Sequence, residues 1–198
     1  MLTCVVDANK NRDVAIVDIP NAFVQTIVED EKDKVLICIH GPLVDILVSI
    51  APSVYGPYVT VGKKGKKQLL VQCLTALYGT MVALLLYYKK FVKRLKFKGF
   101  KLSPYDPWVA NKQVNGKQLT VCFHMDNCKE LHFTPKVADE MIEWLQSECK
   151  NVFKDGTGQM KVYCGKTHKY LGMSLDFSHP NQWRVTMIDY VDEIVVRL

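Results

Sequence analysis

The chain has 198 residues, 48% of them hydrophobic, and a net charge of +6. This size and composition suit one globular domain with a substantial core, or a part of a larger domain. Seven cysteines without a C-x-x-C pair disfavour a disulfide framework or a zinc ribbon, and favour reduced thiols in the cytosol or nucleus. The N-terminus lacks a secretory pattern, and the longest apolar stretch is too short to cross a bilayer, so no membrane partner is expected.

The first half of the chain predicts alternating strands and helices. Apolar and β-branched runs predict strands over 14–19, 34–39 and 68–73. Helices are predicted over 21–28, 42–50 and 76–98. The last of these is amphipathic, with Thr75 expected as its N-terminal cap and Gly99 as its end.

The second half adds more strands and a hairpin. The predicted strands cover 108–114, 117–124, 128–133, 170–177 and 184–188, and the predicted helices cover 137–150 and 189–198. Asn115-Gly116 between two strands is a strong signal for a tight hairpin. Because the elements lack a strict βαβ rhythm, we expect an α+β fold with an antiparallel sheet covered on one face by helices.

Two aspartates, about a hundred residues apart, each end an apolar strand. Asp18 follows the run 14–17, and Asp126 follows 121–125 where a hairpin turn is expected. Carboxylates on neighbouring strands provide the hard oxygen ligands that Mg²⁺ requires. The alternative is that each aspartate is an ordinary turn residue.

The residues around these aspartates resemble the reverse transcriptase of copia-type LTR retrotransposons. Four stretches carry the resemblance, in the order of that family: Asp18-Ile-Pro-Asn-Ala-Phe23, Leu74-Thr-Ala-Leu-Tyr-Gly79, His124-Met-Asp-Asn127 and Tyr170-Leu-Gly-Met-Ser-Leu175. Each motif is short, and their common order and spacing make the combined signal specific. The resemblance covers roughly residues 12–198.

The resemblance implies a polymerase palm with part of the fingers over 1–198, with the upstream fingers, the thumb and an RNase H domain absent. It implies nucleotidyl transfer to a primer 3′-hydroxyl with two Mg²⁺ ions, or Mn²⁺ in their place. The implied partners are an RNA or DNA template with its primer, deoxynucleoside triphosphates and the rest of a retrotransposon polyprotein.

The resemblance also assigns roles to particular residues. The implied catalytic residues are Asp18, Asp126 and Asn127, and the implied metal ligands are Asp18, Asp126 and the carbonyl of Ile19. Phe23, Tyr78 and Gly79 would contact the nucleotide, with the Phe23 ring excluding a ribose 2′-hydroxyl. The alternative for Phe23 is an ordinary core aromatic. Lys89, Lys90, Lys93 and Arg94 would contact template phosphates, or else form only a solvated helix face.

The sequence departs from the family pattern where charge matters most. Asn127 replaces the second acid of the Asp-Asp box, and Met81 and Val82 replace the usual Lys and Gln. An amide offers a metal an oxygen without charge, so activity is expected to be impaired. Three functions therefore remain: a polymerase domain, an inactive basic nucleic-acid-binding fragment of the same origin, and a structural domain with no nucleic-acid role.

Two other groups of residues invite a functional interpretation. Cys122, His124, Cys128 and His132 contain zinc-ligand types, and they share one parity across a turn, which predicts one common face. Their spacing is not that of a zinc finger, and buried thiols are the expected alternative. The lysines within 63–67 predict either a phosphate contact or a hairpin tip that is only solvated.

Overall fold

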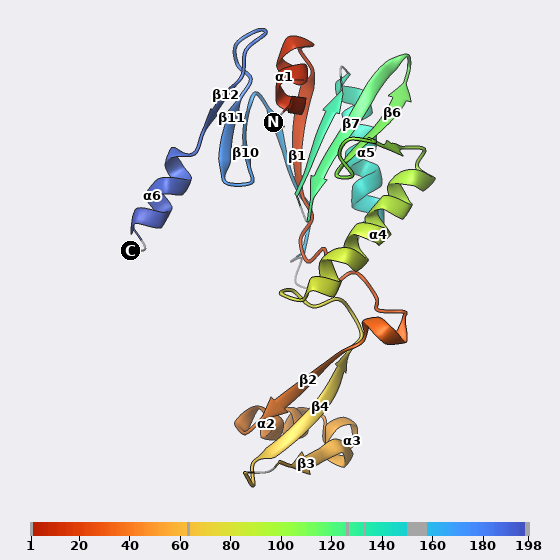
Figure 1. Cartoon of the computed structure of the whole chain (residues 1–198), viewed down its shortest axis with the longest axis vertical. Coiled ribbons are helices and arrows are strands. Elements are labelled where there is room, and N and C mark those ends of the chain that lie inside the picture. Colours follow the sequence, from red (N-terminus) through yellow and green to blue (C-terminus); the bar gives the residue numbers. More distant parts are fainter. Residues whose placement is uncertain (1, 63, 126, 133, 150–157, 197–198) are drawn as a thin grey trace.

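The protein folds around a large antiparallel sheet. The computed structural model describes residues 2–62, 64–125, 127–132, 134–149 and 158–196. In spatial order the strands of the large sheet are β5 (Lys101–Leu102), β6 (Val109–Val114), β7 (Lys117–His124), β8 (Asn127–His132), β1 (Asp13–Asp18) and β9 (Lys161–Gly165). Every neighbouring pair is antiparallel. Helices accompany the sheets (Figure 1), and the predicted α+β class is confirmed.

The two faces of the large sheet carry different layers. Helices α4 (Met81–Phe97) and α5 (Pro135–Glu148) cover one face, where Ala15 and Val17 of β1 join their apolar side chains in the main core. Helix α1 (Leu2–Asn9) covers the other face, where Val14 and Ile16 pack against it. Strand β1 is therefore buried on both sides, which explains its continuous apolar run.

A second, smaller sheet adjoins the α1 layer. Its strands are β10 (Thr167–Tyr170), β11 (Met173–Asp176) and β12 (Arg184–Thr186), followed by helix α6 (Ile188–Val196). Leu175 and Phe177 pack into the same cluster as the apolar face of α1. Among the described residues, no helix is both long and apolar enough to cross a membrane.

A separate lobe projects from the large sheet (Figure 1). It consists of β2 (Val35–His40), β4 (Lys67–Cys73) and β3 (Val59–Val61), helices α2 (Pro42–Ile50) and α3 (Pro52–Tyr55), and the 3-10 turns η1 (Glu31–Asp33) and η2 (Gly56–Tyr58). The two chain segments that lead into and out of the lobe pair with each other. The amide of Val28 donates to the carbonyl of Leu74 at 3.0 Å, and the amide of Ala76 donates to that of Thr26 at 2.8 Å.

Turn chemistry explains the predictions that are confirmed. Asn115 and Gly116 have φ angles of 51° and 74°, the left-handed pair that a tight hairpin between right-twisted strands requires. Helix α2 begins at Pro42, whose fixed φ suits the first helical turn. Gly99, at φ 92°, follows the end of α4.

One helix prediction in the first half is wrong and the start of another is misplaced, and one interaction explains both. The segment 21–28 forms turns, because Ile27 bridges to Thr75 instead of continuing a helix. Thr75 is consequently part of that bridge and does not cap α4, which begins at Met81 after Thr80. Gly79 at φ 86° lies between the bridge and the helix, in a conformation that a right-handed helix excludes.

The prediction of one continuous strand over 170–177 is also wrong. Leu171 and Gly172 have φ angles of 50° and 75°, so they turn the chain and separate β10 from β11. Helix α1 was not predicted at all. Its eight residues are too few to show a clear helical period in the sequence.

Candidate functional site

A row of polar residues crosses four strands at one end of the large sheet. His124 of β7 lies opposite Asn127 of β8, Asn127 lies opposite Asp18 of β1, and Asp18 lies opposite Lys161 of β9. Directly opposed residues of antiparallel strands point to the same face with their Cβ atoms about 5 Å apart. We call these four residues the polar row. The tight register brings Asp18 and Asn127, two of the predicted catalytic residues, side by side.

The polar row lies on the face of the sheet that is away from α4 and α5. Side chains alternate along β1, and Asp18 shares its face with Ile16, which packs in the α1 cluster. Ile19 follows Asp18 and is fully buried in the main core. The row is half-buried at Asp18, Asn127 and His124 and exposed at Lys161.

The side chains of the polar row determine whether it can bind a metal cation. Among the described residues it offers one carboxylate, the Asp18 side chain, together with the amide oxygen of Asn127 and the imidazole of His124. Across the described ranges no three His, Cys, Asp or Glu side chains gather closely enough to hold a metal ion. Asp126, the second predicted carboxylate, lies outside the described residues. Lys161 adds a positive charge opposite Asp18, which opposes cation binding.

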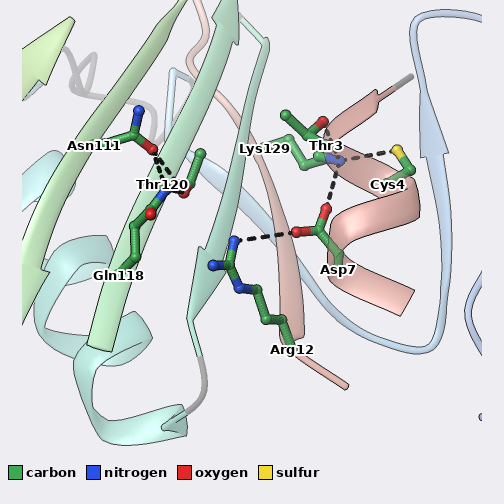
Figure 2. A network of polar contacts seen from close by, with 8 residues as sticks. All are labelled: Thr3, Cys4, Asp7, Arg12, Asn111, Gln118, Thr120 and Lys129. Atoms are coloured by element: carbon green, nitrogen blue, oxygen red, sulfur yellow. Dashed lines mark hydrogen bonds and ion pairs between the residues drawn. The ribbon is translucent and has the colours of Figure 1, made fainter. Parts of the chain in front are cut away.

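The same face carries a compact polar cluster on β6 and β7 (Figure 2). Thr120 donates to the side-chain oxygen of Asn111 at 2.9 Å, and the Gln118 amide donates to the same oxygen at 2.7 Å. On the opposite face of β7, Leu119 and Val121 are buried in the main core. The two faces of β7 thus differ sharply, with hydrogen-bonding groups on the side of the polar row.

A buried charged cluster joins α1 to β8 (Figure 2). The Nζ atom of Lys129 lies 3.2 Å from the Asp7 carboxylate, and Arg12 lies 3.5 Å from the other oxygen of Asp7. Burial raises the pKa of Asp7 in spite of both cations, whereas for Lys129 the nearby Asp7 and Cys4 outweigh burial and raise the pKa. This cluster was not predicted, because most residues of β8 are polar and nothing in its sequence marks Lys129 as buried.

The predicted nucleotide-binding residues lie in and beside the main core. Phe23 is only 5% exposed, and its ring lies 4.5 Å from that of Tyr78 and 5.6 Å from that of Tyr87, both edge to face. Tyr78 is 47% exposed, and Gly79 directly follows it in a left-handed conformation. Phe23 therefore has the packing of a core aromatic, and its role against a sugar stays a prediction.

The predicted template-binding residues lie on α4, in the layer behind the sheet. They do not meet the polar row, because α4 covers the opposite face. Lys89 and Lys93 are exposed, whereas Lys90 donates to the carbonyl of Gln25 and Arg94 binds Glu148 of α5. Burial lowers the pKa of Lys90, as does the neighbouring charge of Arg94. All four line a recess of about 610 Å³ whose other lining residues include Thr26, Asp30, Trp144 and Glu148.

The register of the β7–β8 hairpin removes the zinc interpretation. Cys122 lies opposite Lys129 on the α1 face, whereas Cys128 lies opposite Phe123 and is buried in the main core. The sheet itself separates the two thiols, so the shared face assumed from their spacing is wrong. Burial raises the pKa of the Cys122 thiol. The basic turn is described at Lys64, Lys66 and Lys67, while Lys63 lies outside the described residues.

Comparisons with known proteins give only distant structural neighbours. No family model and no curated protein matches the chain. The apo telomerase of Candida tropicalis is similar at a TM-score of 0.45 with 11% identity, over 93% of this chain and 35% of the telomerase. The Candida albicans telomerase, in a complex with a fragment of telomeric RNA, is similar at a TM-score of 0.41 with 8% identity, over 88% and 33%. The chain spans about a third of both proteins, and likeness at this level supports no conclusion about its function.

Proposed function

We propose that the chain is a reverse-transcriptase palm with part of the fingers, of the copia type, which transfers deoxynucleotides to a primer 3′-hydroxyl on an RNA or DNA template. One observation carries the proposal: Asp18 lies directly opposite Asn127 at the end of a hairpin. The pair occurs on a sheet face that α4 and α5 leave free. The lobe of β2, β3 and β4 would be the partial fingers.

The motif residues have distinct parts in the proposed reaction. Asp18, the carbonyl of Ile19 and Asp126 would hold two Mg²⁺ ions, or Mn²⁺. Such a metal pair supplies a polarised attacking oxygen and charge neutralisation at the leaving pyrophosphate. Asn127 contributes an amide oxygen beside Asp18, and Phe23 would limit the space at C2′ of the sugar. The deoxynucleoside triphosphate is attacked at its α-phosphorus in line with the leaving group.

A second candidate is a nucleic-acid-binding domain without catalysis. Two features of the polar row favour it: Asn127 lacks the negative charge of the acid it replaces, and Lys161 places a cation opposite Asp18. The missing charge at Asn127 and the added cation at Lys161 both weaken the attraction of the polar row for divalent cations at short range, where Coulomb energies are largest. The exposed Lys89 and Lys93 could still bind phosphates.

Primer extension tests the proposal. The protein would be incubated with an RNA template, a DNA primer, deoxynucleoside triphosphates and Mg²⁺ or Mn²⁺. We expect little extension by the unmodified chain, and more by Asn127→Asp, because that substitution restores a carboxylate beside Asp18. Asp18→Asn in the same background should abolish the gain. Gln113→Glu, which adds a carboxylate on β6 outside the polar row, is the matched control.

Each result separates the candidates. Extension that requires both Asp18 and the Asn127→Asp substitution supports the polymerase. Salt-sensitive binding to the primer–template by every variant, with no extension by any, supports the binding domain. Absence of both binding and extension would leave only a structural role for the chain and would remove the proposal.

A further inference from the structure

The buried charged cluster between α1 and β8 is not used by the proposed reaction. Lys129 is the centre of this cluster, with 1% of its side chain exposed, and the Asp7 side chain is fully buried. The ammonium of Lys129 lies 3.1 Å from the hydroxyl of Thr3, 2.9 Å from the thiol of Cys4 and 3.2 Å from the Asp7 carboxylate. An ammonium has three donors, and here each has one partner on the same helix (Figure 2).

The cluster lies directly beside the polar row. Lys129 follows Asn127 by two residues and therefore points to the same face of the sheet. Lys129 is opposite Ile16 on β1 just as Asn127 is opposite Asp18. Strands β7, β8 and β1 thus carry His124, Asn127 and Asp18 of the polar row as well as the docking position of α1.

Register is the property that such a cluster controls. A shift of β8 by one residue would turn Lys129 into the apolar core under α4 and α5, and would turn Asn127 away from Asp18. An apolar pair could hold α1 to the sheet equally well, since buried ion pairs are seldom more stable than matched apolar contacts. What an ion pair adds is discrimination, because a displaced ammonium has no partner in the apolar core.

We propose that Lys129 and Asp7 are positioning residues, which fix the register of β8 so that Asn127 remains opposite Asp18. The pair acts through the backbone and contacts neither substrate nor metal. That Lys129 and Asp7 hold β8 in register is inferred from the geometry alone. That this register keeps Asn127 and Asp18 together for binding a divalent cation rests on the proposed function.

Four proteins test the proposal: the parent, Lys129→Met, Asp7→Leu and the double variant. The control is the exposed pair formed by Lys166 and Asp13, at 4.0 Å, replaced in the same way. Thermal unfolding reports stability, and amide hydrogen exchange followed by NMR reports local opening at 16–18, 122–124 and 127–129. We expect both single variants to unfold at a lower temperature. The double variant should recover only part of the loss, because Arg12, which lies 3.5 Å from Asp7, also loses that carboxylate.

Amide hydrogen exchange in the double variant shows whether Lys129 and Asp7 fix the register of β8 or only add to the stability of the fold. We expect it to remain at least about tenfold faster than in the parent at the amides beside the polar row, with β2 and β4 unchanged. Recovery of the parent's exchange rates together with its stability would overturn the proposal, because an apolar pair would then serve equally well. The surface control should leave these rates unchanged.

A second measurement keeps this proposal separate from the proposed function. Mn²⁺ broadens the NMR signals of nearby amides, and we expect Asp18-dependent broadening at Asn127 in the parent that weakens in the double variant. Absence of broadening in the parent would count against the polymerase proposal alone, since the exchange rates still decide whether Lys129 and Asp7 hold the register.

Discussion

The side chain of Arg94 on α4 binds both the main chain and the side chain of Glu148, the last residue of α5. Its Nη1 atom donates to the Glu148 carbonyl at 2.6 Å, and its Nε atom lies 3.2 Å from the Glu148 carboxylate. The carbonyls at the end of a helix have no intrahelical partner and carry partial negative charge, so a guanidinium satisfies both needs. Arg94 therefore fastens the two helices of the rear layer together.

Replacing Arg94 should loosen that layer. We expect Arg94→Ala to lower the free energy of unfolding by about 1–2 kcal/mol, a value kept modest because both side chains are partly exposed. Arg94→Lys should recover only part of the loss, since an ammonium lacks the planar fork. Chemical denaturation measures the effect, with the exposed Lys93→Ala as a control that should change little.

Phe23 allows a test of packing against sugar selection. Phe23→Ala removes a ring that contacts Tyr78 and Tyr87, so the free energy of unfolding should fall by about 3–5 kcal/mol. Phe97→Ala, at a ring that is 93% exposed, is the control. If the restored variant with Asn127→Asp extends primers, Phe23→Ala should also raise ribonucleotide incorporation relative to deoxynucleotides. A stability loss with an unchanged ratio would make Phe23 a core residue only.

His168 predicts a loss of stability in acid. It is 4% exposed, its Nε2 atom lies 2.9 Å from the Gly165 carbonyl, and burial lowers its pKa below the usual 6.5. The unfolded chain therefore takes up the proton first, and the His168 contribution is present above about pH 6.5 and lost as the pH falls toward the folded-state pKa. Urea unfolding from about pH 8 to about pH 5 should show this decline. His168→Gln should flatten it, and the exposed His179→Gln should not.

Two glycines with the same backbone conformation offer a matched comparison. Gly172 and Gly116 have φ angles of 75° and 74°, but a Cβ at Gly172 would lie 3.2 Å from the ring of Tyr190 in α6, whereas Gly116 has open space. Each change to alanine should cost roughly 1 kcal/mol for the left-handed conformation. Gly172→Ala should cost more, and adding Tyr190→Ala should remove the difference. Equal costs in denaturation would show that α6 yields to the added methyl.

The four cations of α4 should not contribute equally to nucleic-acid binding. Lys89 and Lys93 are exposed, whereas Lys90 and Arg94 are held by contacts within the protein. Neutralising either exposed lysine should reduce the slope of log affinity against log salt by about one unit, and Lys90→Met should change it less. Fluorescence anisotropy with an RNA–DNA hybrid measures the slope. An unchanged slope in a Lys89/Lys93 double variant would identify this face as merely solvated.

Local chemistry predicted much of the fold because several signals do not depend on distant residues. Asn115-Gly116 determines a hairpin by its own conformational freedom, and Pro42 begins a helix by its own ring. The pairing of Ile27 with Thr75 depends on residues nearly fifty positions apart. Local sequence therefore predicted a helix over 21–28 that does not form, and a start for α4 that is several residues too early.

The candidate site was predictable in part for the same reason. Asp18 was predicted because it ends an apolar strand, and Asn127 because it occupies the second position of a resembled Asp-Asp box; the register places them opposite each other. Lys161 and Asp7 were missed, since only the strand order brings Lys161 beside Asp18 and only the docking of α1 brings Asp7 to Lys129. The alternation that assigns a side chain to one face requires the turn length, which explains the wrong placement of Cys128.

The paired segments at the base of the lobe make it a modular insertion. The chain enters the lobe at Val28 and leaves it at Leu74, and these residues are already joined by a main-chain hydrogen bond. Because the entry and exit points are adjacent, an ancestral gene could lengthen, shorten or exchange the intervening segment without changing the ends that the rest of the fold must accommodate. Evolution can thus remodel the lobe separately from the sheet that carries Asp18.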